Sequence, residues 1–416
     1  MPRLRVLISA YACSPYQGSE PAVGWGFVQE LATCHDLWVV VEEVKFRADI
    51  ERYLKEHPEF PTSVRFLFIR KRRNRWLRKI WPPSYYRYYR KWHEDAFVLA
   101  RNLHAEVGFD IAHQLTMVGF REPGFLWKLG IPFVWGPVGG MGVFPWRFLR
   151  IIGFQSAIYY LGYNLVNIVQ MRFLQRPQLA ARAAGVGLIT ATPENQLGAL
   201  RFWNCNSILL NEVGLPAANL SKEIRRRTPG EPLRIVWAGL LIPRKALNLG
   251  LSALNLLHGR QWELHILGNG PRIDAWKLLA DQLGLLDRCH FHGWVGRDDA
   301  LNIMSTAHVM LITSLRDLSS TVTIEALAAG LPIVCLDHCG FADVVDDSCG
   351  IKVPVTTPDE TINGIACALE RLGSNEDLRY QLATGALCRA ERYSWSRKCK
   401  IVEALYGRVL GDRGIQ

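Results

Sequence analysis

The chain has 416 residues, of which 49% are hydrophobic and 21% charged, and no low-complexity tract occurs. This length exceeds what one ordinary hydrophobic core organises, so we expect two or three globular domains. Lysine and arginine number 49 against 38 aspartate and glutamate residues, a formal charge of +11 that suits nucleic acid, an acidic membrane face or a phosphorylated small molecule without choosing among them.

The sequence gives no sign of export or of a membrane span. Residues 1–5 lead directly into the apolar run 6–10, which has the length of a strand and is followed by no signal-type cleavage site. No run of about eighteen apolar residues occurs. The ten cysteines are scattered without a CxxC pair or histidines at zinc-ligand spacing, which is typical of buried thiols in a reducing compartment. We expect a cytoplasmic protein without a metal site.

Short apolar runs, each followed by a loop and a helical pattern, recur in both halves. Unbroken runs of Val, Ile and Leu are typical of parallel strands buried on both faces, and their alternation with helices predicts an α/β fold. Because the pattern occurs twice, we expect two doubly wound, Rossmann-like domains. The expected strands are 5–9, 37–41, 64–69, 111–113, 133–135 and 187–191, and then 234–238, 263–267, 290–291, 309–312 and 332–336.

A polar stretch rich in proline and arginine, residues 216–232, separates the halves, and an apolar strand begins directly after it. This composition is typical of an interdomain linker. We therefore expect a first domain over 1–212, a linker over 213–232 and a second domain from residue 233.

Two segments of the first half interrupt the alternation. Residues 70–92 interleave Arg and Lys with Trp and Tyr, and residues 144–176 are apolar and aromatic with arginines near both ends. Such segments suit an anionic membrane surface. The alternative is a solvated basic loop for the first and a core helix for the second. Single-stranded nucleic acid also favours basic–aromatic interleaving, but no RNA-binding signature is present, so no nucleic-acid partner is expected.

Candidate phosphate ligands follow the first strand of the second half. Gly239 ends that strand and permits a tight turn, and Arg244 and Lys245 come shortly after it. Ligands of doubly wound folds bind at the carboxyl edge of the sheet, where these two cations could hold a diphosphate.

The next two strands of the second half also end in candidate ligand loops. Gly268 and Gly270 form a G-x-G turn at which backbone could approach a ligand, although a plain tight turn is an equally good interpretation. The loop that ends at Val295 has apolar faces suited to framing a base.

The segment 314–332 carries the strongest local pattern. A strand runs into a polar loop that opens a helix at Ser320, Thr321 and Val322, and the helix ends at Gly330. The N–H groups and the positive dipole end of such a helix suit a diphosphate.

Two acidic residues flank this helix start. The Glu325 carboxylate could accept hydrogen bonds from ribose hydroxyls, and Asp317, ahead of the helix, could meet a sugar. The alternatives are an ordinary surface glutamate and a loop or capping aspartate.

These motifs, in this order, resemble the donor half of retaining glycosyltransferases of family 4, which have the GT-B fold. The matching residues are Gly239 and Lys245; Gly268, Gly270 and Pro271; Phe291, Gly293 and Val295; Asp317 and Glu325 through Pro332; and Gly340 and Gly350.

The first half resembles the same family more faintly, in its surface-polysaccharide branch. Residues 14–26 are similar to the loop that faces acceptor and donor phosphates, with Gly18 allowing close phosphate approach. Residues 110–113 resemble the family's Asp-x-x-His, which implies that His113 orients acceptor or sugar. Residues 393–406 resemble the segment that crosses back, so the second domain is expected to end at 395 and a helix over 396–416 to return to the first domain.

The resemblance implies two Rossmann-like domains facing across a cleft. It also implies a hexosyl transfer, with retention, from a UDP- or GDP-linked sugar to a saccharide or lipid-linked saccharide acceptor, without a metal or other cofactor. Arg244, Lys245 and the helix start at Ser320–Val322 would stabilise the leaving diphosphate, Glu325 would hold the ribose and Asp317 the sugar. A peripheral position on the inner membrane face would suit a lipid-linked acceptor.

Three departures from the family pattern leave alternatives open. Leu240 replaces the usual Arg after Gly239, Asp317 replaces the usual Glu, and Leu115 stands where relatives often have a second His. A catalytically inactive nucleotide-binding subunit and a nucleotide-sugar epimerase of the same fold are therefore alternatives. A nicotinamide-dependent oxidoreductase would need G-x-G-x-x-G after its first strand, and residues 12–26 do not have it.

Overall fold

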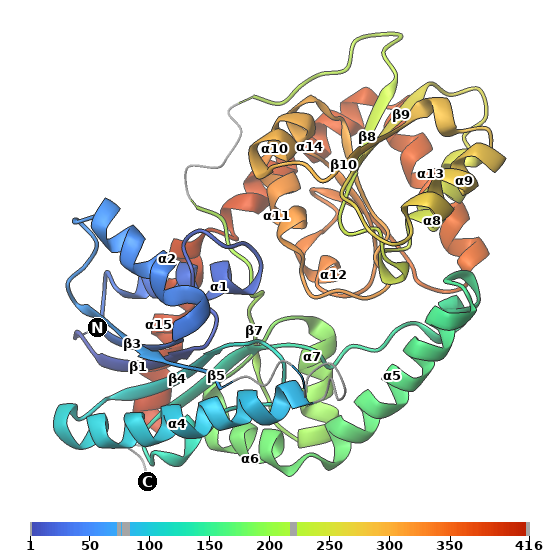
Figure 1. Ribbon diagram of the computed structural model, residues 1–416. Helices are drawn as coiled ribbons and strands as arrows, with labels where there is room; N and C mark the ends of the chain where they lie inside the picture. Colours follow the sequence, from blue (N-terminus) through green and yellow to red (C-terminus); the bar gives the residue numbers. More distant parts are fainter. Residues whose placement is uncertain (1, 73–75, 77–83, 217–222, 413–416) are drawn as a thin grey trace. The chain divides into compact units, whose positions relative to one another are not determined.

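The computed structural model describes residues 2–72, 76, 84–216 and 223–412. The chain divides into two compact units. Unit 1 draws on residues 1–141, 168–214 and 395–416, and unit 2 on residues 142–167 and 215–394. Figure 1 colours the chain by sequence and labels its main elements.

Unit 1 is built on a parallel sheet of seven strands in the order β3-β2-β1-β4-β5-β6-β7. Its central strands are rich in apolar residues without strict alternation and are buried along almost their whole length, as expected when helices cover both faces. The strands are β1 Arg5–Ala10, β2 Asp36–Glu42, β3 Val64–Ile69, β4 Ile111–Thr116, β5 Phe133–Val138, β6 Leu188–Thr190 and β7 Ile208–Leu209.

The helices of unit 1 alternate with these strands. They are α1 Glu20–Leu31, α2 Glu43–Glu56, α4 Ser84–Val107, α6 Gln175–Ala184, α7 Pro193–Gly198 and α15 Trp395–Asp412, with short helical turns at η1 Leu126–Lys128, η3 Gly185–Gly187 and η4 Ala199–Trp203. The C-terminal helix α15 packs on α1, where a Cβ on Gly26 would lie 2.2 Å from the Trp395 ring. Glycine is therefore required at position 26, and the expected return of the C-terminal helix to the first domain is observed.

Unit 2 has a parallel sheet of six strands in the order β10-β9-β8-β11-β12-β13. The strands are β8 Leu233–Ala238, β9 Trp262–Leu267, β10 Cys289–Gly293, β11 Val309–Ile312, β12 Ile333–Leu336 and β13 Gly350–Val353. The helices are η2 Trp146–Ile151, η6 Pro243–Lys245, α8 Leu247–Asn255, α9 Ile273–Gln282, η7 Leu286–Arg288, α10 Arg297–Thr306, α11 Thr321–Ala328, α12 Phe341–Val344, α13 Pro358–Ser374 and α14 Glu376–Glu391.

Helix pairs cover this second sheet: α8 packs with α13, and α11 packs with α14 (Figure 1). Each expected strand is present in the two sheets, and the expectation of two Rossmann-like units is confirmed. The short edge strands β7 and β13 were not expected from the sequence.

Residues 142–167 differ from their expected place. The expected boundaries assigned them to the first domain, whereas they pack in unit 2. The physical reason is apolar burial, because Phe144, Phe148 and Tyr160 join the core that contains Trp237 and Leu247.

The expected linker is also partly bound to unit 2. Among its described residues, Arg225 pairs with Glu231 at 2.5 Å, and the Arg227 N–H donates to Glu376 at 3.0 Å. These contacts fix residues 225–231 on unit 2, which a solvated linker would not show.

Helix α5, Phe154–Phe173, carries the chain from unit 2 into unit 1. Its buried positions include Asn164 and Asn167, whose amides donate to the backbone carbonyls of Phe144 at 2.8 Å and Gly142 at 3.1 Å. Large apolar side chains on the same helix are exposed: Phe154, Ile158, Tyr159, Leu161, Leu165, Val166, Val169 and Phe173. The usual polarity of a surface helix is therefore reversed over this exposed face, which does not fit the alternative of a core helix.

The structure describes the second interrupting segment, 70–92, only in part. Residues 73–75 and 77–83 lie outside the described residues. The remainder includes the start of α4, where Tyr89 and Trp92 are buried. These two aromatic side chains therefore pack in the core of unit 1.

Candidate functional site

A compact group of charges lies where β8 and β11 end in unit 2. The Nζ of Lys245 is 2.5 Å from Oδ2 of Asp317, and Nη1 of Arg244 is 3.3 Å from Oδ1 of the same carboxylate. Lys245 and Asp317 are largely buried. We call Arg244, Lys245, Asp317 and the first turn of α11 the anion site, since two cations face one carboxylate there.

Backbone contacts fix the loop that carries the two cations. The Thr313 hydroxyl donates to the Lys245 carbonyl at 2.7 Å and accepts from the Trp237 indole at 3.0 Å, and the Leu315 N–H donates to the Arg244 carbonyl at 2.8 Å. The end of β11 therefore positions both cations at the carboxyl edge of the sheet, where parallel α/β sheets bind ligands.

The charge on Asp317 is secured by its neighbours. Burial alone would raise the pKa of this carboxyl group, but Lys245 and Arg244, followed by the Leu318 N–H at 3.0 Å, hold the pKa below its ordinary value. Asp317 is therefore ionised at neutral pH, and the three side chains carry a net charge of about +1. That excess leaves the site attractive to a further anion.

Helix α11 begins beside these charges. Its N-cap residue Ser320 has φ 59° and makes no side-chain hydrogen bond to the first turn. A serine with positive φ costs of order 1 kcal/mol and is more common at functional sites than elsewhere. The first-turn N–H groups of Thr321 and Val322 are thus not capped by the Ser320 hydroxyl and can meet an anion.

Glu325 lies one turn further along α11. Its Oε1 accepts from Nε of Arg297 at 3.0 Å, so an exposed arginine at the start of α10 orients this carboxylate. Sequence reasoning missed Arg297, since a lone basic residue after Gly296 gives no signal. It likewise missed Arg316, which stacks on the Tyr163 ring at 3.9 Å and donates to its hydroxyl.

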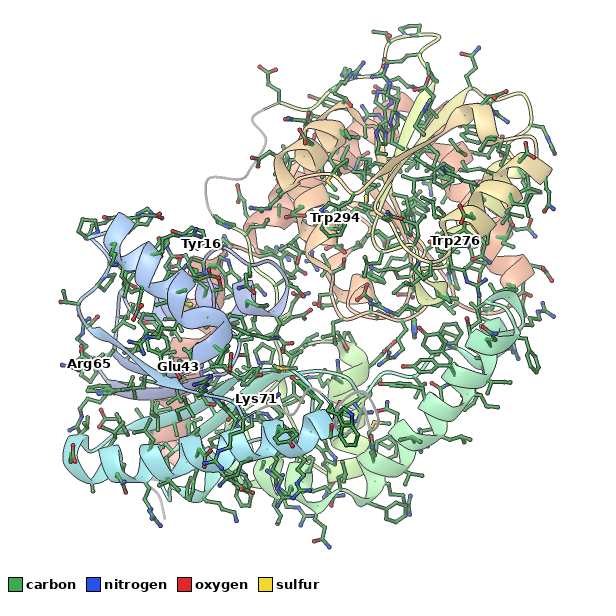
Figure 2. All side chains as sticks on the ribbon, in the orientation of Figure 1. Tyr16, Glu43, Arg65, Lys71, Trp276 and Trp294 are labelled. Carbon is green, nitrogen blue, oxygen red and sulfur yellow. The ribbon has the colours of Figure 1, made fainter. Side chains whose placement is uncertain are left out.

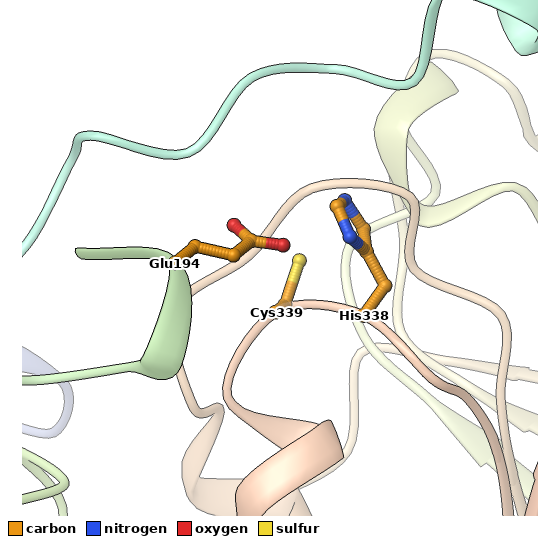
Figure 3. A group of neighbouring side chains, drawn as sticks. All are labelled: Glu194, His338 and Cys339. Atoms are coloured by element: carbon orange, nitrogen blue, oxygen red, sulfur yellow. The ribbon is translucent and has the colours of Figure 1, made fainter. Parts of the chain in front are cut away.

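The loop that follows β12 also supports the anion site. Figure 3 shows two of its side chains, His338 and Cys339. The Asp317 N–H donates to Sγ of Cys339 at 3.2 Å, and the Gly340 N–H donates to the Leu318 carbonyl at 3.0 Å. A Cβ on Gly340 would lie 2.7 Å from Cα of Ser319, so glycine is required for the two loops to touch.

The G-x-G turn after β9 approaches protein backbone in the described structure. A Cβ on Gly268 would lie 1.9 Å from the Gly239 carbonyl oxygen, and one on Gly270 would lie 2.6 Å from that of Leu241. These glycines let the β9 loop pack on the β8 loop. The plain-turn interpretation therefore fits Gly268 and Gly270 better than direct ligand contact. Gly239 instead leaves room for the Lys245 side chain, which would lie 3.4 Å from a Cβ at that position.

Residues 221–384 match the family described as "Glycosyl transferases group 1". Among curated relatives, D-inositol 3-phosphate glycosyltransferase of Saccharomonospora viridis is 27% identical over 203 residues, which are 46% of each chain. Lipopolysaccharide glucosyltransferase WaaG of Escherichia coli is 30% identical over 155 residues, 35% of this chain and 40% of WaaG. The chain spans about half the length of the curated relatives it matches.

The sequence similarity to group 1 glycosyltransferases thus lies in residues 221–384. The solved structure of HepE from Anabaena in complex with UDP extends the similarity to the whole fold, with a TM-score of 0.61, 14% identity, and coverage of 97% of this chain and 100% of HepE. At that identity the likeness shows the fold alone. The expected GT-B architecture, built from two Rossmann-like units, is confirmed.

The matched segment 221–384 contains every site residue expected after the linker. The anion site brings together Arg244, Lys245, Asp317 and the helix start, and Glu325 follows on the same helix. Val295, half-buried, lies in the loop after β10 beside Trp294, which is 77% exposed (Figure 2). A cavity of about 400 Å³, lined among others by Arg227 and Trp262, lies where β8 and β9 begin, away from the carboxyl edge.

In unit 1 the expected phosphate loop is open. A Cβ on Gly18 would meet no atom within 4 Å, whereas one on Gly24 would lie 2.2 Å from the Ala12 carbonyl oxygen. Gly24 therefore lets α1 pack on the loop, and Gly18 leaves space for a ligand. The loop is braced by Asp49, which accepts from Ser14 at 2.6 Å and from Gln17 at 2.8 Å.

The structure does not support a role for His113 in the reaction. Its side chain is fully buried, Nδ1 lies 2.8 Å from the Tyr406 hydroxyl and Nε2 lies 2.9 Å from the Gly136 carbonyl. The carbonyl requires a proton on Nε2, so Nδ1 accepts from Tyr406 and no ring nitrogen is left for a substrate. Burial lowers the pKa of His113 to about 4, which keeps the ring neutral. His113 links β4 to α15 as a structural residue.

Proposed function

We propose that the chain transfers a hexosyl group, with retention, from a UDP- or GDP-linked sugar to a saccharide or lipid-linked saccharide. The observation that supports the proposal is the anion site: Arg244 and Lys245 hold Asp317 at the carboxyl edge of the sheet, shortly before α11 begins, within the segment that matches group 1 glycosyltransferases. HepE, of the same fold, was solved with UDP, and WaaG is named for glucosyl transfer in lipopolysaccharide.

In this proposal the diphosphate binds beside Lys245 and the N–H groups of Thr321 and Val322. A diphosphate carries more negative charge than a carboxylate, so it competes for the cations that Asp317 holds in the free protein. Asp317 can then accept hydrogen bonds from sugar hydroxyls. Glu325, oriented by Arg297, accepts from the ribose.

The chemical step breaks the bond between the anomeric carbon and the diphosphate oxygen and forms a bond from the acceptor oxygen on the same face. The departing phosphate oxygen takes the acceptor proton, so no separate base is needed. Lys245, Arg244 and the α11 N–H groups stabilise the charge that develops on the leaving group. No metal or other cofactor takes part in this scheme.

The acceptor side of the proposal rests on α5. No helix among the described residues is long and apolar enough to cross a membrane. The chain has no aspartate or glutamate from residue 123 to residue 193. Arg147 and Arg150 precede α5 in the sequence, where Arg150 also pairs with Asp359 at 3.3 Å, and Arg172 lies in its last turn. Apolar side chains flanked by cations suit an anionic membrane surface, where a lipid-linked acceptor would be held.

The test is a panel of UDP- and GDP-sugars, scored by nucleotide release with and without a lipid-linked saccharide acceptor. We expect release from one donor, dependent on acceptor, with the anomeric configuration retained by NMR. Lys245→Ala should lower the rate by about 10²-fold or more, because a fixed charge on the leaving group is lost. Lys277→Ala, an exposed lysine on α9, is the matched control and should keep the wild-type rate.

Three outcomes contradict the proposal. Donor binding without turnover points to an inactive subunit, and isomerisation of the donor without acceptor points to an epimerase. Normal turnover in Lys245→Ala means that the diphosphate is held elsewhere.

A further inference from the structure

A group of histidines on one sheet face of unit 2 takes no part in the proposed transfer. Adjacent parallel strands β9 and β10 place His265 directly opposite His290, with Glu263 and His292 two residues away on the same strands. Side chains two residues apart share a face of a regular strand, which puts Glu263, His265 and His290 on one side of the sheet. His292 lies where the register of β10 shifts, and its ring nitrogen lies 3.0 Å from Nδ1 of His265. We call Glu263, His265, His290 and His292 the histidine cluster.

Side chains on the opposite face of β9 and β10 pack in the hydrophobic core of unit 2. Leu264, Ile266 and Cys289 belong to the core cluster of unit 2, and Phe291 packs against it. The histidine cluster therefore lies on the other face, half-buried at Glu263 and His265 and exposed at His290 and His292. A solvent ion can reach it.

The ligand atoms of the cluster are slightly farther apart than they would be around a bound metal ion. Ligand atoms of Glu263, His265 and His290 all lie within 4.8 Å of one another, and Nε2 of His265 is 3.8 Å from Oε2 of Glu263. Ligand atoms around a tetrahedral zinc ion are about 3.3 Å apart, so small side-chain rotations suffice. Nε2 of His265 is buried and makes no hydrogen bond, which is a costly state for a ring nitrogen that no ligand engages.

The fourth member supplies the contact that metal-binding histidines usually have. Nδ1 of His265 lies 3.0 Å from Nε2 of His292, whose ring stacks on that of His265. A proton on Nδ1 donated to His292 leaves the lone pair of Nε2 facing Glu263 and His290. This fixed tautomer is the arrangement that orients a ligating imidazole.

We propose that Glu263, His265 and His290 bind a divalent transition-metal ion of the zinc type, with His292 as a positioning residue. The two imidazoles and one carboxylate are ligands that Zn²⁺ accepts, and water would complete the shell. The ion would join edge strand β10 to β9. Arg234 competes with the ion for the Glu263 carboxylate, because its Nε lies 3.6 Å from Oε2 of Glu263.

The experiment titrates metal-stripped, tag-free full-length protein with Zn²⁺ by calorimetry and with Co²⁺ by visible absorption. We expect one equivalent to bind and the cobalt spectrum to lack the near-ultraviolet charge-transfer band of thiolate ligands, which separates the cluster from the free cysteines. His265→Gln and His290→Gln should each raise the Kd at least about tenfold, and His292→Gln by about 10- to 100-fold. His258→Gln, an exposed histidine outside the cluster, should not change it.

Since the cluster shares no residue with the anion site, nucleotide binding should be unaffected in these variants, so failure of either proposal can be recognised separately. His290 is exposed, so His290→Gln should fold normally, as circular dichroism would show. The proposal is overturned if wild-type protein binds no stoichiometric ion, if both ligand variants bind as tightly as wild type, or if a thiolate band accompanies binding.

Discussion

Asp317 and Lys245 show how a single pair of residues can hold a binding site ready without a ligand. A lysine as buried as Lys245 needs a counter-charge, and Asp317 provides it at 2.5 Å. If a diphosphate binds as proposed, it takes the place of that carboxylate beside Lys245, so the lysine keeps a counter-charge in both states.

A second buried carboxylate lies in unit 1, beside the open loop at Gly18. Glu20 accepts a hydrogen bond from the Val118 N–H. Burial, reinforced by the negative charge of Glu212 and opposed by that N–H, raises the pKa of Glu20 to about 7. The native state therefore binds this proton more tightly than the unfolded chain, and stability falls as the pH rises from about 4.5 to 7.

Glu20→Gln removes this penalty and keeps an oxygen for Val118. We expect the variant to match the wild type near pH 5 and to be more stable at pH 8, by about 1–3 kcal/mol. Scanning calorimetry at the two pH values measures the difference in melting temperature. If the melting temperatures of variant and wild type differ by the same amount at pH 5 and at pH 8, the pKa of Glu20 is not raised in the folded protein.

Among the elements, helix α5 departs furthest from ordinary surface chemistry. Asn164 and Asn167 are buried, whereas many of its large apolar side chains are exposed; Phe154 is 80% exposed and Phe173 66%. Exposed apolar area of this kind is unfavourable in water unless another surface covers it. An anionic bilayer is the covering surface that the proposed function requires.

The double variant Phe154→Ser/Phe173→Ser should partition onto anionic vesicles at least about tenfold more weakly than the wild type, because two large side chains no longer enter the interface. Flotation with anionic and zwitterionic vesicles measures it. Leu278→Ser, which removes a comparably exposed apolar side chain from α9, should bind like the wild type. If the wild type does not bind anionic vesicles, or if the double variant binds them equally well, α5 is not the membrane-binding surface.

The elements also show what sequence alone can predict. Apolar runs located each expected strand within a few residues, since strands buried on both faces are rich in Val, Ile and Leu. Ile208–Leu209 and Gly350–Val353 are too short to give such a pattern. Lys245 and Asp317 were identified separately, but their ion pair depends on two loops that meet only in the fold. The role expected for His113 was wrong because a motif at a strand end does not reveal distant contacts. The hydroxyl of Tyr406, in the last helix, forms a hydrogen bond with Nδ1 of His113.

At the scale of the whole molecule, the chain passes repeatedly between two Rossmann-like units, and residues 142–167 belong to the unit that follows them in sequence. Their apolar residues complete a core that the second half alone would leave open. Unit 2 contains the entire anion site, so the proposed donor binding falls within this unit. Unit 1 contributes the open loop at Gly18.

The most direct test of this account is a crystal structure of the protein with a bound nucleoside diphosphate. We predict diphosphate oxygens within hydrogen-bond distance of Lys245 Nζ and of the Thr321 or Val322 N–H, with the ribose at Glu325. A nucleotide bound elsewhere, for example in the cavity beside Arg227 and Trp262, with the anion site still closed by Asp317, would contradict it.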